Sequence, residues 1–229
     1  MVKITRNNNS AKSLKAIDDL KIAKAKDSGY NIDSVNDALE EMFHGKCYIC
    51  ENKYISSINI EHLKPHRNDI DLKYDFNNLF YSCAHCNNIK NTKYDNILDC
   101  TKVNVDEKIA FRLKGNILSK KQYYAEALDD DSLVMETTNL INEVYTGKTV
   151  QKRIEAKNIV KLLDDDYSSF RSLLKDYKLS SGQVKEDSYY YILQQLQEDS
   201  PFAGFKRWII KDNKDDYPEF MKVLTRKGA

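Results

Sequence analysis

The chain has 229 residues, of which 41% are hydrophobic and 31% are charged, and it contains only seven glycines and three prolines. This composition favours a helix-rich globular protein with a buried core over a disordered or an all-β protein. The 36 Lys and Arg residues balance the 35 Asp and Glu residues, so the total charge does not by itself indicate a nucleic-acid partner.

The sequence contains no signal that would direct the chain to a membrane. The opening stretch, MVKITRNNNS, lacks the apolar segment of a signal peptide, and no run of about 18 apolar residues occurs. We therefore expect a cytoplasmic protein that does not bind a membrane. Because cytoplasmic thiols stay reduced, the five cysteines indicate metal binding or thiolate chemistry and not disulfides.

Residues 1–45 are predicted to form a first segment with a basic arm and two helices. Seven Lys and Arg residues but only two Asp residues fall within residues 1–26. The first helix is indicated by four apolar residues on one helical face: Ala16, Ile17, Leu20 and Ala23. The second is indicated by five: Val35, Ala38, Leu39, Met42 and Phe43. We expect Asp33 or Ser34 to cap the second helix and Gly45 to end it.

Residues 46–104 are predicted to form a second, loop-rich segment that holds four of the five cysteines. Cys47 and Cys50 in CYIC, and Cys83 and Cys86 in CAHC, make two C-x2-C pairs. A two-residue gap directs both sulfurs of a pair at one ion, and four thiolates match the tetrahedral preference of Zn²⁺. We predict a structural zinc site, because four sulfurs leave no open position for a substrate. The alternative is four buried cysteines spaced in this way by chance.

The residues between and just after these pairs include a set suited to metal-assisted hydrolysis. Glu61 and His62 are adjacent, Asn78 follows 16 residues after His62, and Asn87 comes directly after Cys86. Carboxylate and amide oxygens are hard ligands that suit Mg²⁺. A histidine has a pKa near neutrality and can take a proton from water as a general base. The pattern is typical of phosphodiester hydrolysis.

Residues 105–229 are predicted to form a third, helical segment packed on the loop-rich one. A helix is indicated by Thr137, Leu140, Ile141 and Val144, and a long one from about 149 by Leu163, Tyr167, Phe170, Leu174 and Tyr177. Two more are expected at about 187–199 and after Pro201. This segment has no second catalytic pattern, so we expect it to dock a partner.

The run CYIC…IEHLKPH…NNLFYSCAHCNNIK resembles the HNH nuclease superfamily, whose core is a β-hairpin and a helix around a metal, often held by a four-cysteine zinc site. This resemblance implies a mainly α protein with a small ββα-metal module, an α+β fold. The stretches ILDCT, LINEVYTGKTVQKRIEA and EDSPFAGFKRWIIKDN look like the PtuB-type HNH proteins of Septu and retron-associated antiphage systems. This second resemblance extends over nearly the whole chain.

Position by position, the resemblance implies a role for each residue of the set. His62 would be the general base, and Glu61 and Asn87 would bind a catalytic Mg²⁺ or Mn²⁺. Asn78 would hold the histidine-bearing loop through hydrogen bonds to backbone. The superfamily's products imply 5′-phosphate and 3′-hydroxyl ends.

Four further side chains are candidates for contacts with nucleic-acid phosphates: Lys64, His66, Arg67 and Lys90. The alternative for each is an ordinary surface residue. We expect His85, inside the CAHC turn, to be exposed, and the unpartnered Cys100 to be a small buried apolar residue.

Together these features predict a metal-dependent HNH endonuclease that cuts DNA and works with an ATPase of the PtuA type. Three alternatives stay open: an RNase with the same centre, a stand-alone nuclease without an ATPase, and a zinc-stabilised adaptor that binds nucleic acid or protein without cutting.

Overall fold

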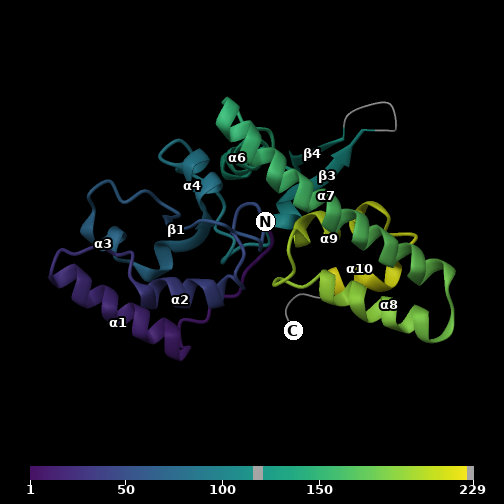
Figure 1. Ribbon diagram of the computed structural model, residues 1–229, viewed down its shortest axis with the longest axis horizontal. Helices are drawn as coiled ribbons and strands as arrows, with labels where there is room; N and C mark the ends of the chain where they lie inside the picture. Colours follow the sequence, from purple (N-terminus) through teal and green to yellow (C-terminus); the bar gives the residue numbers. More distant parts are fainter. Residues whose placement is uncertain (116–120, 226–229) are drawn as a thin grey trace.

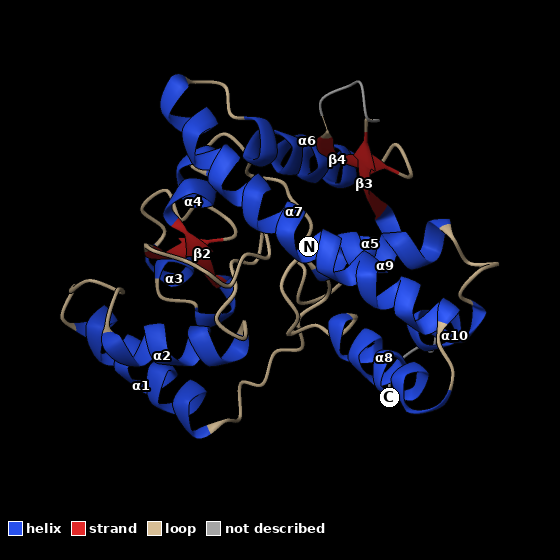
Figure 2. Cartoon of the chain, turned by 45° about the vertical axis from the view of Figure 1, so that its right-hand side comes forward, coloured by secondary structure: helices blue, strands red, loops and turns tan. Residues whose placement is uncertain are grey.

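The computed structural model describes residues 1–115 and 121–225. Within these ranges the chain is largely helical, with two separate two-stranded antiparallel sheets (Figure 2). The prediction of a mainly α protein of the α+β class is thus confirmed. None of the described helices is both long and apolar enough to cross a membrane.

The amino-terminal residues form the two expected helices, α1 (Ala11–Ala25) and α2 (Asp33–Met42), which pack on each other. The Ser10 hydroxyl accepts a hydrogen bond from the backbone N–H of Ser13 and so caps α1. The predicted cap of α2 is wrong, because Ile32 occupies that position and makes no side-chain cap bond.

The loop-rich segment holds an antiparallel strand pair followed directly by a helix. Strand β1 (Ile58–His62) pairs with β2 (Leu79–Cys83), and Glu61 lies opposite Phe80. The connection contains a short helix, α3 (Ile70–Lys73), and a 3-10 turn, η1 (Phe76–Asn78). Helix α4 (Ala84–Lys90) begins where β2 ends, because Cys83 is also its N-cap.

The third segment, predicted to be helical, also contains two strands. After α5 (Val105–Lys108), strands β3 (Ile109–Lys114) and β4 (Gln122–Ala127) form an antiparallel pair, so this segment is not wholly helical. The remaining helices are α6 (Ser132–Thr146), α7 (Val150–Leu179), α8 (Gly182–Gln195), α9 (Ala203–Asp212) and α10 (Pro218–Thr225). Of these, α10 was not predicted.

One hydrophobic core joins residues of all three predicted segments, including Leu39, Phe80 and Phe205. A smaller core lies under the far half of α7 and is made by Phe170, Leu174, Ile192, Leu196, Ile210 and Phe220. In Figure 1, helices α1 to α4 lie on one side of the molecule and α8 to α10 on the other, with the amino terminus between them.

Candidate metal centre and catalytic pocket

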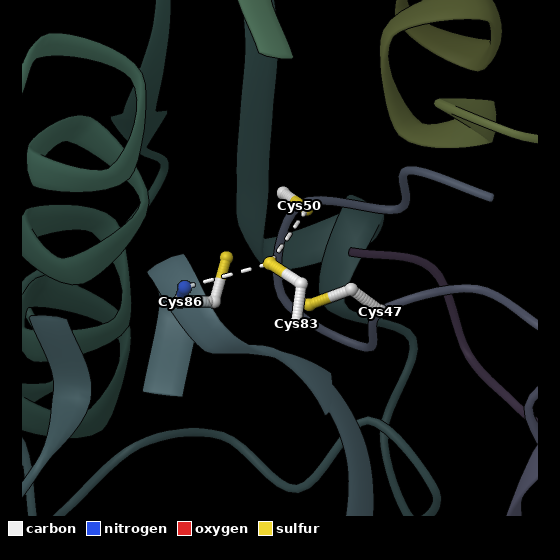
Figure 3. Close-up of side chains that lie close together, drawn as sticks. All are labelled: Cys47, Cys50, Cys83 and Cys86. Carbon is white, nitrogen blue, oxygen red and sulfur yellow. Dashed lines mark hydrogen bonds between the residues drawn. The ribbon is translucent and has the colours of Figure 1, made fainter. Parts of the chain in front are cut away.

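Four cysteines converge between the loop after α2 and the start of α4 (Figure 3). The sulfur atoms of Cys47, Cys50, Cys83 and Cys86 lie within 4.8 Å of one another, and all four residues are buried. In a tetrahedral site with Zn–S bonds of about 2.3 Å, neighbouring sulfurs are about 3.8 Å apart. The Cys50 and Cys83 sulfurs, at 3.9 Å, match that spacing. The cluster can therefore hold a structural metal such as zinc.

The burial of these thiols also fits a bound cation. Burial, followed by hydrogen bonds with the other three cysteines, raises the pKa of the Cys86 thiol well above its ordinary value. Against the effect of burial, the hydrogen bonds from the other three cysteines lower the pKa of the Cys47 thiol, so without a positive charge at the centre the cluster favours a single thiolate. A divalent ion supplies that charge and turns the other thiols into thiolate ligands as well.

His85 holds the cysteine cluster to the helical segment, so its predicted exposure is wrong. Its side chain is buried: Nδ1 lies 2.7 Å from the Glu155 carboxylate in α7, and Nε2 lies 2.9 Å from the carbonyl oxygen of Val144 in α6. These two contacts fix the ring between α6 and α7. The hydroxyl of Tyr145 adds a hydrogen bond of 3.0 Å to the carbonyl of Cys50.

A pocket of about 390 Å³ opens beside the cluster, between the end of β1 and helix α4. It brings together five of the predicted site residues: Glu61, His62, His66, Arg67 and Asn87. The other lining residues are Pro65, Asn88, Asn91 and Thr92. Residues separated by about 25 positions in the sequence thus share one site.

The imidazole of His62 is fixed at the inner side of this pocket. Its Nε2 lies 2.9 Å from the carbonyl oxygen of Lys73, and its ring contacts Tyr30 edge-on at a centroid distance of 4.6 Å. A carbonyl can only accept, so Nε2 carries the proton and Nδ1 has a free lone pair. Burial lowers the pKa of His62 below its ordinary value, which favours the neutral ring that a general base needs.

Glu61 has one carboxylate oxygen paired and the other without a partner. Its Oε1 accepts a hydrogen bond of 2.9 Å from the Lys90 ammonium, whereas Oε2 is buried and has no hydrogen-bond partner among the described residues. Burial raises the pKa of Glu61, and Lys90 opposes that effect. Because an unpaired buried carboxylate oxygen is costly, Oε2 fits a position that a cation would complete.

Asn78 joins the two ends of the loop that follows His62. Its amide oxygen accepts from the Lys64 backbone N–H at 2.9 Å, and its amide nitrogen donates to the carbonyls of Lys64 at 2.9 Å and Leu72 at 3.2 Å. The side chain is buried and does not line the pocket. These bonds are the kind that a loop-holding residue makes.

The structure places the four predicted phosphate contacts differently. Arg67 lines the pocket, is exposed and pairs with Asp95. His66 lines it half-buried, with its ring centroid 4.8 Å from that of His62. Lys64 is exposed but does not line the pocket. Lys90 is fully buried against Glu61, so in this arrangement its ammonium does not reach the surface to contact a phosphate.

We found no family model, curated protein or solved structure that matches the chain. The residues of the site therefore carry the functional argument. A carboxylate with a free oxygen, a neighbouring amide side chain and a neutral imidazole form a donor set of hard oxygens and one base. That set fits Mg²⁺ or Mn²⁺ and a bound water.

Two contributors to the pocket were not predicted. Tyr30, in the loop between α1 and α2, packs on the His62 ring, and the carbonyl of Lys73 orients it. Neither residue carries a sequence signal, because an aromatic contact and a backbone carbonyl have no fixed spacing from the histidine. The amino-terminal segment therefore helps to build the site.

Proposed function

We propose that this protein is a metal-dependent endonuclease of the HNH type that hydrolyses phosphodiester bonds in DNA. The observation that carries the proposal is the pocket in which His62, with its lone pair on Nδ1, lies beside Glu61 and Asn87. The sequence resemblance to HNH nucleases leads to the same residues. The buried cysteine cluster supports a zinc ion that stabilises the module.

In this mechanism His62 accepts a proton at Nδ1 from the attacking water. The Lys73 carbonyl keeps the other nitrogen protonated and so favours the tautomer that leaves the Nδ1 lone pair available. Glu61 and Asn87 would hold a divalent cation, which would supply charge stabilisation at the scissile phosphate and the leaving 3′ oxygen. Loss of a general base typically slows hydrolysis by roughly 10²- to 10⁴-fold.

The other parts of the pocket serve binding. Arg67 lies on the exposed rim and can exchange its pairing with Asp95 for a phosphate. His66, whose Nδ1 accepts from the Asn68 backbone N–H at 3.2 Å, leaves Nε2 available to a phosphate oxygen. Asn78 keeps the loop that carries both residues closed on itself.

The proposal includes an ATPase partner of the PtuA type, which would control the nuclease during antiphage defence. Several large apolar side chains at the end of α7 and along α8 are well exposed, among them Leu179 at 73% and Tyr190 at 64%. Exposed apolar side chains of this kind are typical of protein contacts. The ATPase is co-expressed with the wild type or with a Leu179→Ser/Tyr190→Ser double variant. Co-purification with the wild type that is lost in the double variant would support the partner. Unchanged co-purification with the double variant would exclude these side chains as the contact.

The nuclease proposal is tested by incubating the purified protein with supercoiled plasmid and Mg²⁺ or Mn²⁺, with and without EDTA. We expect nicking that EDTA abolishes and that Glu61→Gln and Asn87→Ala reduce at least 100-fold. Glu40→Gln and Asn96→Ala are matched controls, because both residues are exposed and lie outside the pocket.

The same assay separates the remaining alternatives. Matched DNA and RNA oligonucleotides, single- and double-stranded, identify the substrate class. Cleavage of RNA alone would replace the DNase proposal with an RNase, and binding without cleavage of any substrate would favour the non-cutting adaptor. Cleavage by the isolated protein at a rate that the ATPase does not change would favour a stand-alone nuclease.

A further inference from the structure

A buried cation lies next to the carboxylate that the proposed function assigns to the metal. Lys90 is fully buried in α4, and its ammonium donates hydrogen bonds of 2.9 Å to Oε1 of Glu61 and 2.8 Å to the carbonyl oxygen of His62. Lys90 is thus fixed to both residues of the Glu61–His62 pair and follows Asn87 by three positions in the same helix.

This pairing changes the charge that a metal ion would meet. Glu61 and Lys90 cancel each other, and Asn87 and the neutral His62 ring add no charge. A divalent cation is normally drawn to a site by uncompensated carboxylates, and Mg²⁺ sites in phosphoryl chemistry often use one or two carboxylates together with the phosphates of the substrate. Among the described residues that line the pocket, Glu61 is the one carboxylate, and the Lys90 ammonium already neutralises it.

We propose that Lys90 is an internal counter-ion that makes loading of the divalent cation depend on the phosphate of the bound nucleic acid. The inference rests on the proposed function and deepens it. In the free protein the ammonium repels the divalent ion and occupies Oε1, leaving Oε2 for weak binding. A phosphodiester in the pocket adds the missing negative charge, so metal and substrate bind together.

Such an arrangement keeps the free protein largely without its catalytic metal. Hydrolysis then begins only where a nucleic-acid backbone lies in the pocket, which limits attack on other phosphate esters. This role of Lys90 differs from a direct contact with phosphate. The Lys90 ammonium is buried against Glu61, away from solvent, and acts on the metal site through the Glu61 carboxylate.

Lys206 provides a matched control. Like Lys90 it is a fully buried lysine paired with a carboxylate: its ammonium lies 3.0 Å from Asp166 and also binds Gln195 and Ser200. None of these residues lines the pocket. Replacing either lysine by methionine keeps an unbranched apolar side chain that is one atom shorter, and it removes the charge.

The test is direct binding of Mn²⁺ alone, measured at pH 8 by electron paramagnetic resonance of the free ion, on protein whose zinc content has been confirmed. We expect Lys90→Met to bind Mn²⁺ at least ten-fold more tightly than the wild type, and Lys206→Met to bind it as the wild type does. Equal or weaker binding by Lys90→Met would overturn the inference. Lys90→Gln, which can still donate a hydrogen bond to Glu61, serves as a second variant without the charge.

A second measurement keeps Lys90 in place. In a His62→Ala background, which removes the proposed base but keeps the carbonyl that Lys90 contacts, a short DNA duplex should tighten Mn²⁺ binding at least ten-fold. No change on adding DNA, while the wild type still cleaves, would reject the inference and leave the nuclease intact. Absence of Mn²⁺ binding with and without DNA, together with absence of cleavage, would reject both.

Discussion

The Nε2 atom of His62 lies 2.9 Å from the carbonyl oxygen of Lys73, and this contact determines which ring nitrogen is free to react. Lys73 is the last residue of the single-turn helix α3 (Ile70–Lys73), and carbonyls at a helix end lack intrahelical donors. The free carbonyl therefore accepts from His62. Both groups gain a partner, and Nδ1 keeps its lone pair.

The pH dependence of cleavage should follow the His62 ring. Because burial lowers the pKa of His62 below its ordinary value of 6.5, the ring is neutral at pH 7 and gains a proton only in more acidic solution. We expect the cleavage rate to be constant from about pH 7 to 8 and to fall at lower pH, with a midpoint below 6.5. A pH–rate profile under single-turnover conditions measures this midpoint. A midpoint above pH 7 would contradict the assignment of His62 as the general base.

Removal of the Asn78 amide should loosen the loop that follows His62. Asn78→Ala leaves the N–H and carbonyl of Lys64 and the carbonyl of Leu72 without these partners, at a cost of about 1–3 kcal/mol in the free energy of unfolding. Cleavage should fall by roughly 100-fold through misplacement of His62. Asn77→Ala is the control, since Asn77 is exposed and its side-chain amide oxygen accepts a hydrogen bond from the Asn8 side chain, outside the loop that Asn78 holds. Equal losses in both variants would exclude the role of Asn78.

The cysteine cluster should be required for folding of the module. Structural zinc contributes about 10–16 kcal/mol in zinc-finger peptides, comparable to the whole stability of a typical domain. Cys50→Ser should therefore release zinc and unfold residues around β1, β2 and α4. Cys100→Ala is the control, because Cys100 is buried outside the cluster, and it should keep its zinc. Metal analysis measures the zinc content of the two variants, and thermal unfolding measures their stability. A Cys50→Ser protein that is folded but free of zinc would contradict the claim that the metal is structural.

Glu51 should make the protein sensitive to acid. Although burial opposes ionisation, the amino group of Met1 and the Lys46 ammonium, with the N–H of Gly204, lower the pKa of Glu51 to about 2. The stability that this carboxylate adds is complete above its unfolded value near 4.5 and is lost as the pH falls toward 2. The difference between the folded and unfolded pKa of Glu51 corresponds to about 3 kcal/mol in the free energy of unfolding.

Glu51→Gln should therefore lower the free energy of unfolding at pH 7 by a few kcal/mol and flatten its decline between about pH 5 and 2. Chemical denaturation at several pH values measures this change. Glu40→Gln, at an exposed position, should leave the curve unchanged. A Glu51→Gln variant with wild-type stability at pH 7 would show that Glu51 adds no net stability.

The sequence predicted the features that depend on local spacing. The helical periodicity of α1, α2 and α7 and the two C-x2-C pairs were correctly recognised, because apolar repeats and paired ligands leave a regular pattern in the chain. The burial of Cys100 was also predicted and is confirmed. The strand pair β3–β4 was missed although IAFRLK and QYYAEA are each strand-length, since neither alternates strictly between apolar and polar residues.

Features that depend on packing between distant segments could not be predicted. His85 looked like an exposed turn residue, but α6 and α7 cover it and supply both hydrogen-bond partners. Lys90 was a candidate phosphate contact, with an ordinary surface lysine as the alternative, yet β1 places Glu61 and the His62 carbonyl at its ammonium. In both cases the partner lies at least 28 positions away, and only the tertiary fold brings it close.

The most direct test of the nuclease account is the rate at which His62→Ala nicks supercoiled plasmid with Mg²⁺, compared with the wild type. The account predicts metal-dependent nicking by the wild type, products with 5′-phosphate and 3′-hydroxyl ends, and a rate roughly 10²- to 10⁴-fold lower in His62→Ala, with zinc content and thermal stability retained. A His62→Ala protein that nicks plasmid as fast as the wild type would contradict the assignment of His62 as the general base.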